Sequence, residues 1–159
     1  MKPSVYIETS VVSYLTARPS RDIAIATHQS YTRDFWDKLD QYHVYISELV
    51  TKEASQGDSG AAQKRLESIE SIKLLTIDKD ALVLSEKLIF EKVMPANQPE
   101  DALHLAVATV NGLDIVLTWN YKHLNNPFTR MLTRQVIEEA GYHCPEICSP
   151  EELLEGENS

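Results

Sequence analysis

Short apolar runs alternate along this chain with longer segments whose apolar residues recur every third or fourth position. The short runs are too continuous to lie half exposed, which is typical of strands buried on both faces. Strands that alternate with amphipathic helices form mostly parallel sheets with helices on both sides. The predicted fold class is therefore α/β, a three-layer α/β/α arrangement around a mostly parallel, twisted sheet of four to five strands.

The pattern predicts the individual elements and where they begin. Thr9 or Ser10 is expected to cap the first helix, Ser20 the second and Asp78 the fifth, because short polar side chains accept hydrogen bonds from free helix N–H groups. We expect a single domain at residues 1–150 and an acidic, frayed tail at residues 151–159. The expected strands are residues 5–7, 44–47, 73–77, 114–118 and 146–148, and the expected helices are 11–15, 21–39, 49–56, 60–69, 79–89, 100–111 and 127–140.

Composition and charge limit the functions that need to be considered. The N-terminal residues contain no apolar signal region, and no apolar run is long enough to span a membrane. We therefore expect a cytoplasmic protein without a membrane partner. The net charge of −9 is unusual for a protein that binds nucleic acid, because phosphates normally require a basic surface. It becomes compatible with that function if several acids converge on bound divalent cations.

Cys144 and Cys148 are the only cysteines, with His143 beside them. Their spacing does not match the usual zinc-binding pairs, and no second pair of ligands completes a four-ligand site. We expect two reduced thiols that are buried or half buried.

Four polar side chains follow or precede strands in a way that brings them to one edge of the sheet. Glu8 follows the first strand, and Glu53 lies about one and a half turns into the helix after the second. Asp101 lies in the first turn of the helix that runs into the fourth strand, and Asn120 follows that strand. Crowded carboxylates raise one another's pKa values, and a hard divalent cation relieves that repulsion. The sequence therefore predicts a Mg²⁺ or Mn²⁺ site.

At these motifs the sequence resembles a known family, the PIN-domain ribonucleases, and among them the VapC-type toxins of toxin–antitoxin pairs. The order and spacing of the motifs cover about residues 4–125. The motifs are Val5-Tyr6-Ile7-Glu8-Thr9-Ser10-Val11, then Ile46-Ser47 with Glu53 and Gly57, then Pro99-Glu100-Asp101-Ala102-Leu103-His104-Leu105-Ala106, and Leu117-Thr118-Trp119-Asn120-Tyr121-Lys122-His123-Leu124.

The resemblance implies both an activity and a site. Glu8, Glu53 and Asp101 stand where the acidic metal-site residues of the family lie, and Asn120 marks the region of its variable fourth acid. The implied activity is endonucleolytic cleavage of single-stranded RNA with one or two Mg²⁺ or Mn²⁺ ions. The implied partners are an antitoxin protein and a second copy of the chain in a homodimer, for which the aromatic residues of the second helix offer apolar surface.

Within this site the residues have different expected roles. Glu8 and Asp101 are expected to be direct metal ligands, and Glu53 a ligand or the base that positions water. Glu48 and Glu100 are competing acids, and His104 and His123 are candidates for acid–base roles. Helix capping and strand ending are alternatives for the three hydroxyl residues expected to hold water or phosphate oxygens, Thr9, Ser10 and Thr118. The candidates for RNA contacts are Arg18, Arg21, Lys122 and His123, with Arg130 and Arg134 as further members of a basic rim.

Two alternatives to an active nuclease remain open. The family usually has Asp where Glu8 stands, and Asn120 is neutral, so the chain could be a PIN-like RNA-binding module with weakened catalysis. The other alternative is a phosphoacceptor receiver domain, also a parallel sheet with acids at strand ends. Asp78 only loosely supplies its acid after the third strand, and the last strand lacks the lysine it requires.

Overall fold

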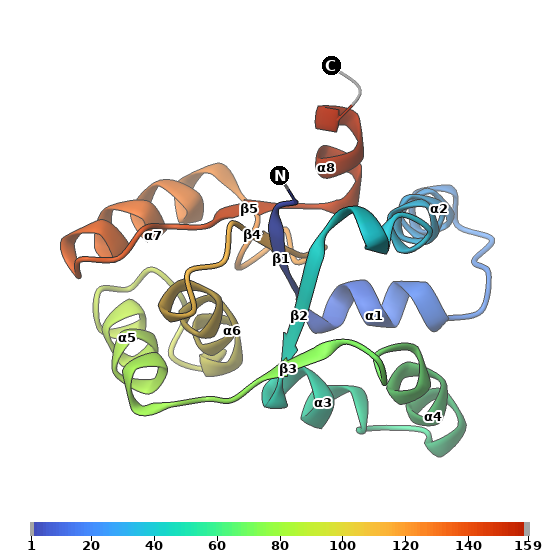
Figure 1. The fold of residues 1–159 in the computed structure, drawn as a ribbon, viewed down its shortest axis with the longest axis horizontal. Coiled ribbons are helices and arrows are strands. Elements are labelled where there is room, and N and C mark those ends of the chain that lie inside the picture. The colour runs from blue at the N-terminus through green and yellow to red at the C-terminus, as the bar shows by residue number, and fades with distance from the viewer. Residues whose placement is uncertain (1, 158–159) are drawn as a thin grey trace.

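The computed structural model describes residues 2–157, and every strand and helix expected from the sequence is present in it (Figure 1). A short 3-10 helix at Leu39–Gln41 precedes the second strand. The strands are β1 (Ser4–Ile7), β2 (His43–Ser47), β3 (Lys73–Leu75), β4 (Ile115–Leu117) and β5 (Glu146–Cys148). The helices are α1 (Thr9–Thr16), α2 (Ile23–Trp36), α3 (Glu48–Ala54), α4 (Ser59–Ser68), α5 (Lys79–Phe90), α6 (Pro99–Val110), α7 (Pro127–Glu139) and α8 (Pro150–Glu157).

The five strands form one sheet in the order β3-β2-β1-β4-β5, and every pair is parallel. Strand β1 is central, and its Tyr6 lies opposite Tyr45 of β2 and Val116 of β4. The strand order reverses between β1 and β4, which makes their carboxyl ends the topological switch point where open α/β sheets build their sites. A receiver-type sheet has the order 2-1-3-4-5, so the sheet order excludes that alternative.

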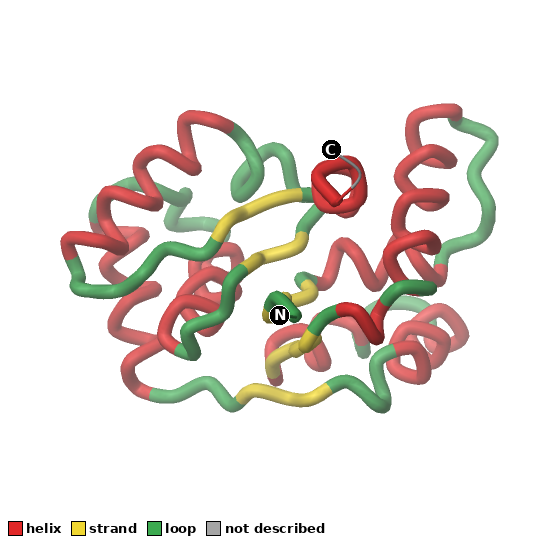
Figure 2. The backbone as a smooth tube through the Cα atoms, turned by 45° about the horizontal axis from the view of Figure 1, so that its top comes forward, coloured by secondary structure: helices red, strands yellow, loops and turns green. Residues whose placement is uncertain are grey.

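Helices cover both faces of the sheet and make the three layers that were expected. Figure 1 shows α5, α6 and α7 on one side of the sheet and α1, α2 and α4 on the other. Figure 2 shows the same arrangement, with the yellow strands between two groups of red helices. Helix α1 contacts α2, α3 and α4, while α5 contacts α6 and α7. The core is buried between these layers, with Tyr6, Phe35 and Leu105 among its largest side chains.

Two helix starts differ from the sequence expectation. Helix α1 is capped by Glu8, whose side chain accepts a hydrogen bond from the Ser10 N–H, and Thr9 is already the first helical residue. Helix α2 is capped by Asp22, which accepts from the Ile25 N–H, whereas Ser20 accepts from the Asp22 N–H. In both cases a carboxylate is the cap, because a full negative charge also interacts favourably with the helix dipole.

The C-terminal segment also differs from the expected frayed tail. Residues 150–157 form helix α8, which packs against α2, and Leu154 is buried. Tyr31 of α2 donates a hydrogen bond to Glu155. The acidic composition of this segment did not indicate a helix, because the helix is stabilised by an apolar tertiary contact and not by its own propensity. The remaining part of the predicted tail, residues 158 and 159, lies outside the described residues.

The aromatic residues of α2 serve the core of the same chain. Phe35 is fully buried and packs edge-to-face against Trp36, and Tyr31 is only partly exposed. They do not provide the spare apolar surface that motivated the homodimer prediction. Both cysteines are free, and burial raises the pKa of Cys144 to about 11 and that of Cys148 to about 12. Within residues 2–157, none of the helices has the length and apolar character needed to cross a membrane.

Candidate functional site

Glu8 lies at the switch point and is held by the strand-to-helix turn and by β4. Its Oε1 accepts hydrogen bonds from the hydroxyls of Ser10 and Thr118, each at 2.6 Å. Its Oε2 accepts from the Ser10 N–H at 3.0 Å. The Trp119 N–H in turn donates to Ser10 Oγ at 2.9 Å, so the residues after β4 are tied to the start of α1. Glu8 is only 6% exposed, and these donors satisfy its charge.

Glu53 of α3 is fixed by contacts from two other elements. Its Oε1 accepts a hydrogen bond from the Thr9 hydroxyl at 2.6 Å and lies 2.6 Å from His104 Nε2 of α6. Burial favours the neutral form of Glu53, but the hydrogen bond and charge of His104 outweigh it and hold its pKa below the ordinary value. Glu53 is therefore an ionised carboxylate with a fixed orientation.

His104 is the buried link between Glu53 and the central strand. Its Nδ1 lies 2.6 Å from the hydroxyl of Tyr6, which lies 2.8 Å from Ser47 Oγ at the start of α3. Burial opposes the charge of the ring, but the hydrogen bond to Glu53 and the surrounding carboxylates outweigh it, so the pKa of His104 is raised. Burial also raises the pKa of Tyr6 far above its ordinary value, which keeps its hydroxyl protonated. The series of contacts from Ser47 through Tyr6 and His104 fixes the orientation of the Glu53 carboxylate.

Asp101 enters the site from the first turn of α6 and has one unsatisfied oxygen. Its Oδ1 accepts from Asn120 Nδ2 at 3.2 Å. Its Oδ2 lies 2.9 Å from His123 Nδ1, an ion-pair contact that does not have hydrogen-bond geometry. Within residues 2–157, this buried oxygen accepts no hydrogen bond. Burial and the charge of Glu8 raise the pKa of Asp101, against the opposing charges of His123 and His104.

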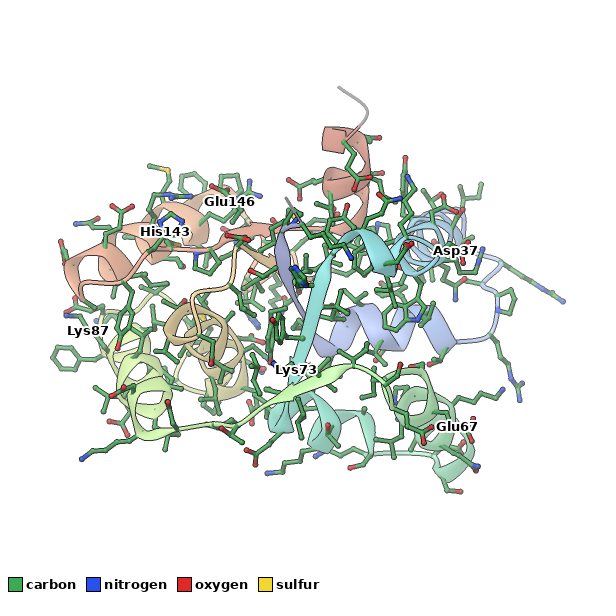
Figure 3. All side chains as sticks on the ribbon, in the orientation of Figure 1. Asp37, Glu67, Lys73, Lys87, His143 and Glu146 are labelled. Carbon is green, nitrogen blue, oxygen red and sulfur yellow. The ribbon has the colours of Figure 1, made fainter. Side chains whose placement is uncertain are left out.

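The burial of these acids distinguishes them from the other charged residues. Figure 3 shows Glu67 of α4, Lys87 of α5 and Asp37, which follows α2, at the periphery of the molecule. Asp101, in contrast, is only 8% exposed, and Glu8 is still more buried. Buried carboxylates that face one another are costly unless a cation or hydrogen-bond donors neutralise them.

The residues fit a divalent metal ion. Glu8, Glu53 and His104 each offer a ligand atom, and these atoms all lie within 4.8 Å of one another. Mg²⁺ and Mn²⁺ prefer oxygen ligands, and both ring nitrogens of His104 already have partners, so His104 is better placed to hold Glu53 than to hold the metal. The buried Oδ2 of Asp101, which accepts no hydrogen bond within residues 2–157, could offer a further carboxylate oxygen to such an ion.

The other predicted residues fall into two groups. The hydroxyls of Thr9, Ser10 and Thr118 lie in the site, but in this structure they donate to Glu53 and Glu8. A role for them in holding water or phosphate stays a prediction. Asn120 bridges the site, since its amide donates to Asp101 and its Oδ1 accepts from the His123 N–H at 3.0 Å.

The basic candidates are spread over the molecule. Lys122 and His123 line a groove beside the N-terminus of α6. Arg18 and Arg21 lie beyond the far end of α1, and the eight residues of α1 span about 12 Å from Glu8. The two remaining rim candidates are paired with acids, Arg130 with Glu152 and Arg134 with Glu138 and Glu146.

The two competing acids have other positions. Glu48 Oε1 accepts a hydrogen bond from the Ile77 N–H and so ties α3 to the end of β3. Glu100 is exposed and lines a groove that also contains Glu53. Tyr6 and Ser47 support His104 and were not predicted from the sequence as site residues. Their only signal was a tyrosine in a buried strand, where its hydroxyl needs a partner.

Comparisons with known proteins agree with this architecture. No protein-family model matches the sequence, and no curated protein matches it. Among solved structures, the chain is similar to a chain in the crystal structure of VapBC2 from Rickettsia felis bound to a DNA fragment from their promoter. The two share 12% identity with a TM-score of 0.55, over 92% of this chain and 98% of that chain. At that identity the likeness shows the fold, and the expected PIN-like fold is confirmed.

Proposed function

We propose that this protein is a Mg²⁺- or Mn²⁺-dependent endoribonuclease that cleaves single-stranded RNA. The observation that carries the proposal is the group of carboxylates at the switch point of the sheet, where Glu8 and Glu53 offer ligand atoms within 4.8 Å of each other and the charge of Glu8 acts on the buried Asp101. A divalent cation in this position would relieve the repulsion among them. Glu8, Asp101 and Glu53 would hold it.

The residues of the site have distinct roles in the proposed hydrolysis. A bound divalent cation supplies Lewis-acid stabilisation of phosphate charge and lowers the pKa of water. Glu53 either completes the ligand set or accepts the proton of the attacking water. Its Oε1 is used by Thr9 and His104, and within residues 2–157 its Oε2 has no hydrogen bond. Asn120 is neutral and donates to Asp101, which favours one ion over two.

The biological role in the proposal is that of a toxin in a toxin–antitoxin pair. Its support is the shared fold with a chain of the VapBC2 structure, together with the sequence motifs. The partners would be an antitoxin protein, a second copy of the chain in a homodimer and cytoplasmic RNA. Lys122 and His123 are the RNA contacts that lie beside the acids, whereas Arg18 and Arg21 would meet RNA only where it extends along α1.

A second candidate function is RNA binding without cleavage, and the environment of Glu8 favours it. The Glu8 carboxylate accepts two hydroxyl hydrogen bonds and caps α1, so it is already satisfied without a metal. A glutamate used in this way holds a cation less tightly than one whose oxygens lack donors.

Cleavage of labelled single-stranded RNA tests the proposal. The purified protein with Mg²⁺ or Mn²⁺ is expected to cut internally, and EDTA is expected to stop the reaction. Attack by water needs no ribose 2′-hydroxyl, so the downstream products should carry 5′-phosphates. Products that end in a 2′,3′-cyclic phosphate would instead indicate metal-free acid–base chemistry by His104 or His123.

The variant Glu8→Asp separates the two candidate functions. Aspartate can still cap α1, but its shorter side chain changes the reach of the carboxylate. Faster cleavage by the variant would identify Glu8 as a poorly tuned ligand in a working site. Cleavage by the variant alone, with none by the wild type, would favour the RNA-binding module.

A further inference from the structure

A second groove, distinct from the one that contains Glu53 and Glu100, lies beside the acidic site, because His123 lines it and contacts Asp101. It has a volume of about 510 Å³ and is bounded by the C-terminal end of α5, the segment between α5 and α6, and the residues after β4. Its buried walls include Val93 and Met94. Pockets of this size, with apolar walls and a few polar groups, commonly bind small ligands or parts of larger ones.

The charges around this groove are opposite to those of the whole protein. The residues of the groove that can carry charge are Lys92, Lys122 and His123, all of them basic, in a chain with a net charge of −9. Within residues 2–157, neither lysine forms an ion pair with a carboxylate. Their ammonium groups are therefore available for an external anion.

Phe90 adds an aromatic surface to the same groove. It is the last residue of α5, and 81% of it is exposed. A ring exposed to this extent beside free cations matches the arrangement by which proteins bind single strands, in which bases stack on aromatic side chains and cations contact phosphates.

The backbone at Lys92 has a conformation that glycine would adopt with less strain than lysine. Lys92 has φ +59°, the only positive φ of a residue other than glycine among residues 2–157. It follows the end of α5, where the Val93 N–H returns to the Leu88 carbonyl and closes the helix. Glycine is favoured at such a position because a Cβ atom is strained there. Strain of this kind is commonly retained where the side chain has a function.

The groove is continuous with the acidic site through His123. This residue lines the groove, and its Nδ1 lies 2.9 Å from Oδ2 of Asp101. From these observations we infer that the groove binds one nucleotide of a single-stranded RNA next to the cleaved phosphate. The base stacks on Phe90, and Lys92 and Lys122 contact the backbone phosphate. The inference rests on the proposed function, since it assigns part of the RNA substrate of the same site.

Binding of a fluorescently labelled single-stranded RNA to the full chain, measured by anisotropy in EDTA, tests this inference without cleavage. Phe90→Ala is expected to weaken binding at least about fivefold, the smaller end of the effect of losing one stacked base. Lys92→Gly is expected to weaken binding and to reduce the slope of log affinity against log salt by about 0.7, the value for one phosphate contact to a single strand. Lys64→Ala and Ile23→Ala, an exposed lysine on α4 and an 84% exposed isoleucine on α2, are the matched controls and should bind as the wild type does.

Thermal unfolding of the same variants separates binding from folding. Lys92→Gly removes the strain at a left-handed position, so its melting temperature should rise by about 2–4 °C while its RNA binding falls. A purely structural role for Lys92 would give the rise in melting temperature with unchanged RNA binding, and this result would overturn the inference.

Other outcomes have equally definite meanings. Wild-type protein that cuts RNA, with Phe90→Ala and Lys92→Gly binding and cutting as well as the wild type, would refute the groove and leave the nuclease intact. Variants that lose RNA binding in a protein that cuts nothing would support the groove and refute the nuclease. Absence of any RNA binding by the wild type would refute both. Variants that lose self-association in a sedimentation run, with RNA binding unchanged, would identify the groove as an interface between copies and overturn the inference.

Discussion

Strands β1 and β4 are neighbours, and at each end of this pair of strands an acidic residue contacts a hydroxyl residue. The two contacts differ in how deeply the acid is buried. At the amino end, Asp114 Oδ2 accepts from the Ser4 N–H at 2.9 Å and from the Ser4 hydroxyl at 3.0 Å. The Asp114 N–H donates to Ser4 Oγ at 2.8 Å, and Asp114 is exposed. At the carboxyl end, Glu8 is also held by hydroxyls, from Ser10 and Thr118, but it is buried.

The difference between the two ends comes from the polarity of the helices. In a parallel sheet, the helix after a strand begins at the carboxyl edge, and so does the helix that returns to the next strand. Helices α3 and α6 therefore bring Glu53 and Asp101 to Glu8, with His104 between them. The same local pairing of acid and hydroxyl is a surface contact at one end and part of a buried, charged cluster at the other.

The largest expected effect is on the rate of RNA cleavage, and it distinguishes Asp101 at the carboxyl end from Asp114 at the amino end. Asp101→Asn should lower the rate of RNA cleavage by at least about 100-fold, because even residues that only support metal ligands typically contribute 10- to 100-fold. Asp114→Asn removes the same charge from the opposite end and should cleave at the wild-type rate. Single-turnover cleavage of labelled RNA measures both. Equal losses in the two variants would mean that the acid at the carboxyl end has no special role.

Metal binding should make the same distinction through stability. Mg²⁺ or Mn²⁺ at 100 times its dissociation constant adds about 2.7 kcal/mol to the free energy of unfolding, or roughly 5–11 °C in melting temperature. The wild type and Asp114→Asn should both show the increase. Asp101→Asn should lose most of it, and without metal it should be at least as stable as the wild type because one buried charge is gone. A full metal response in Asp101→Asn would place the metal elsewhere.

The fold was largely predictable because the determining signals are local. Buried strands such as residues 5–7 are continuous apolar runs, and the helices between them carry a clear periodicity. Helix α8 was missed because its stability comes from packing of Leu154 against α2, which propensity does not reveal. The order of the strands in the sheet could not be predicted from the sequence either, because it depends on which face of the sheet each connection between strands crosses.

The site was predictable in its members but not in their contacts. The three carboxylates were placed at one edge by the polarity of parallel strands and their helices. The sequence pointed to Thr9 or Ser10 as the cap of α1, whereas the structure uses Glu8. The link from Tyr6 through His104 to Glu53 joins three elements that are far apart in the chain, and no local pattern carries that information.

The pH dependence of stability should also reflect the charged cluster at the carboxyl end. The pKa of His104 is raised above 6.5 in the folded protein. Its charged contact with Glu53 therefore makes its full contribution to the free energy of unfolding below that pH. This contribution is lost as the pH rises through the folded pKa. The raised pKa of Asp101 acts in the same direction, because the folded state prefers the protonated acid, but its contribution is lost from the ordinary pKa of an aspartate upward. In EDTA, the free energy of unfolding should therefore fall as the pH rises from about 6.5 through the raised pKa of His104.

His104→Gln is the variant that tests this assignment. Glutamine can still donate a hydrogen bond to Glu53 but does not titrate, so the decline in stability above pH 6.5 should become flatter. Urea unfolding at a series of pH values measures the slope. An unchanged slope in the variant would show that the ionisation lies outside the His104–Glu53 contact.

The smallest expected effect compares the serines at the two ends. Ser4→Ala removes the hydroxyl that bonds Asp114 at an exposed position, where water replaces it, and should cost about 0.5–1 kcal/mol. Ser10→Ala leaves the Trp119 N–H without its acceptor and removes one donor from the buried Glu8. A buried group without a partner costs more, about 1–3 kcal/mol. Urea unfolding in EDTA measures both values, and Mg²⁺ should narrow the gap between them, because a cation beside Glu8 offsets the lost donor. Equal costs in EDTA would show that Glu8 is as well solvated as Asp114, and the contrast between the two ends would then lie in Asp101 and Glu53 alone.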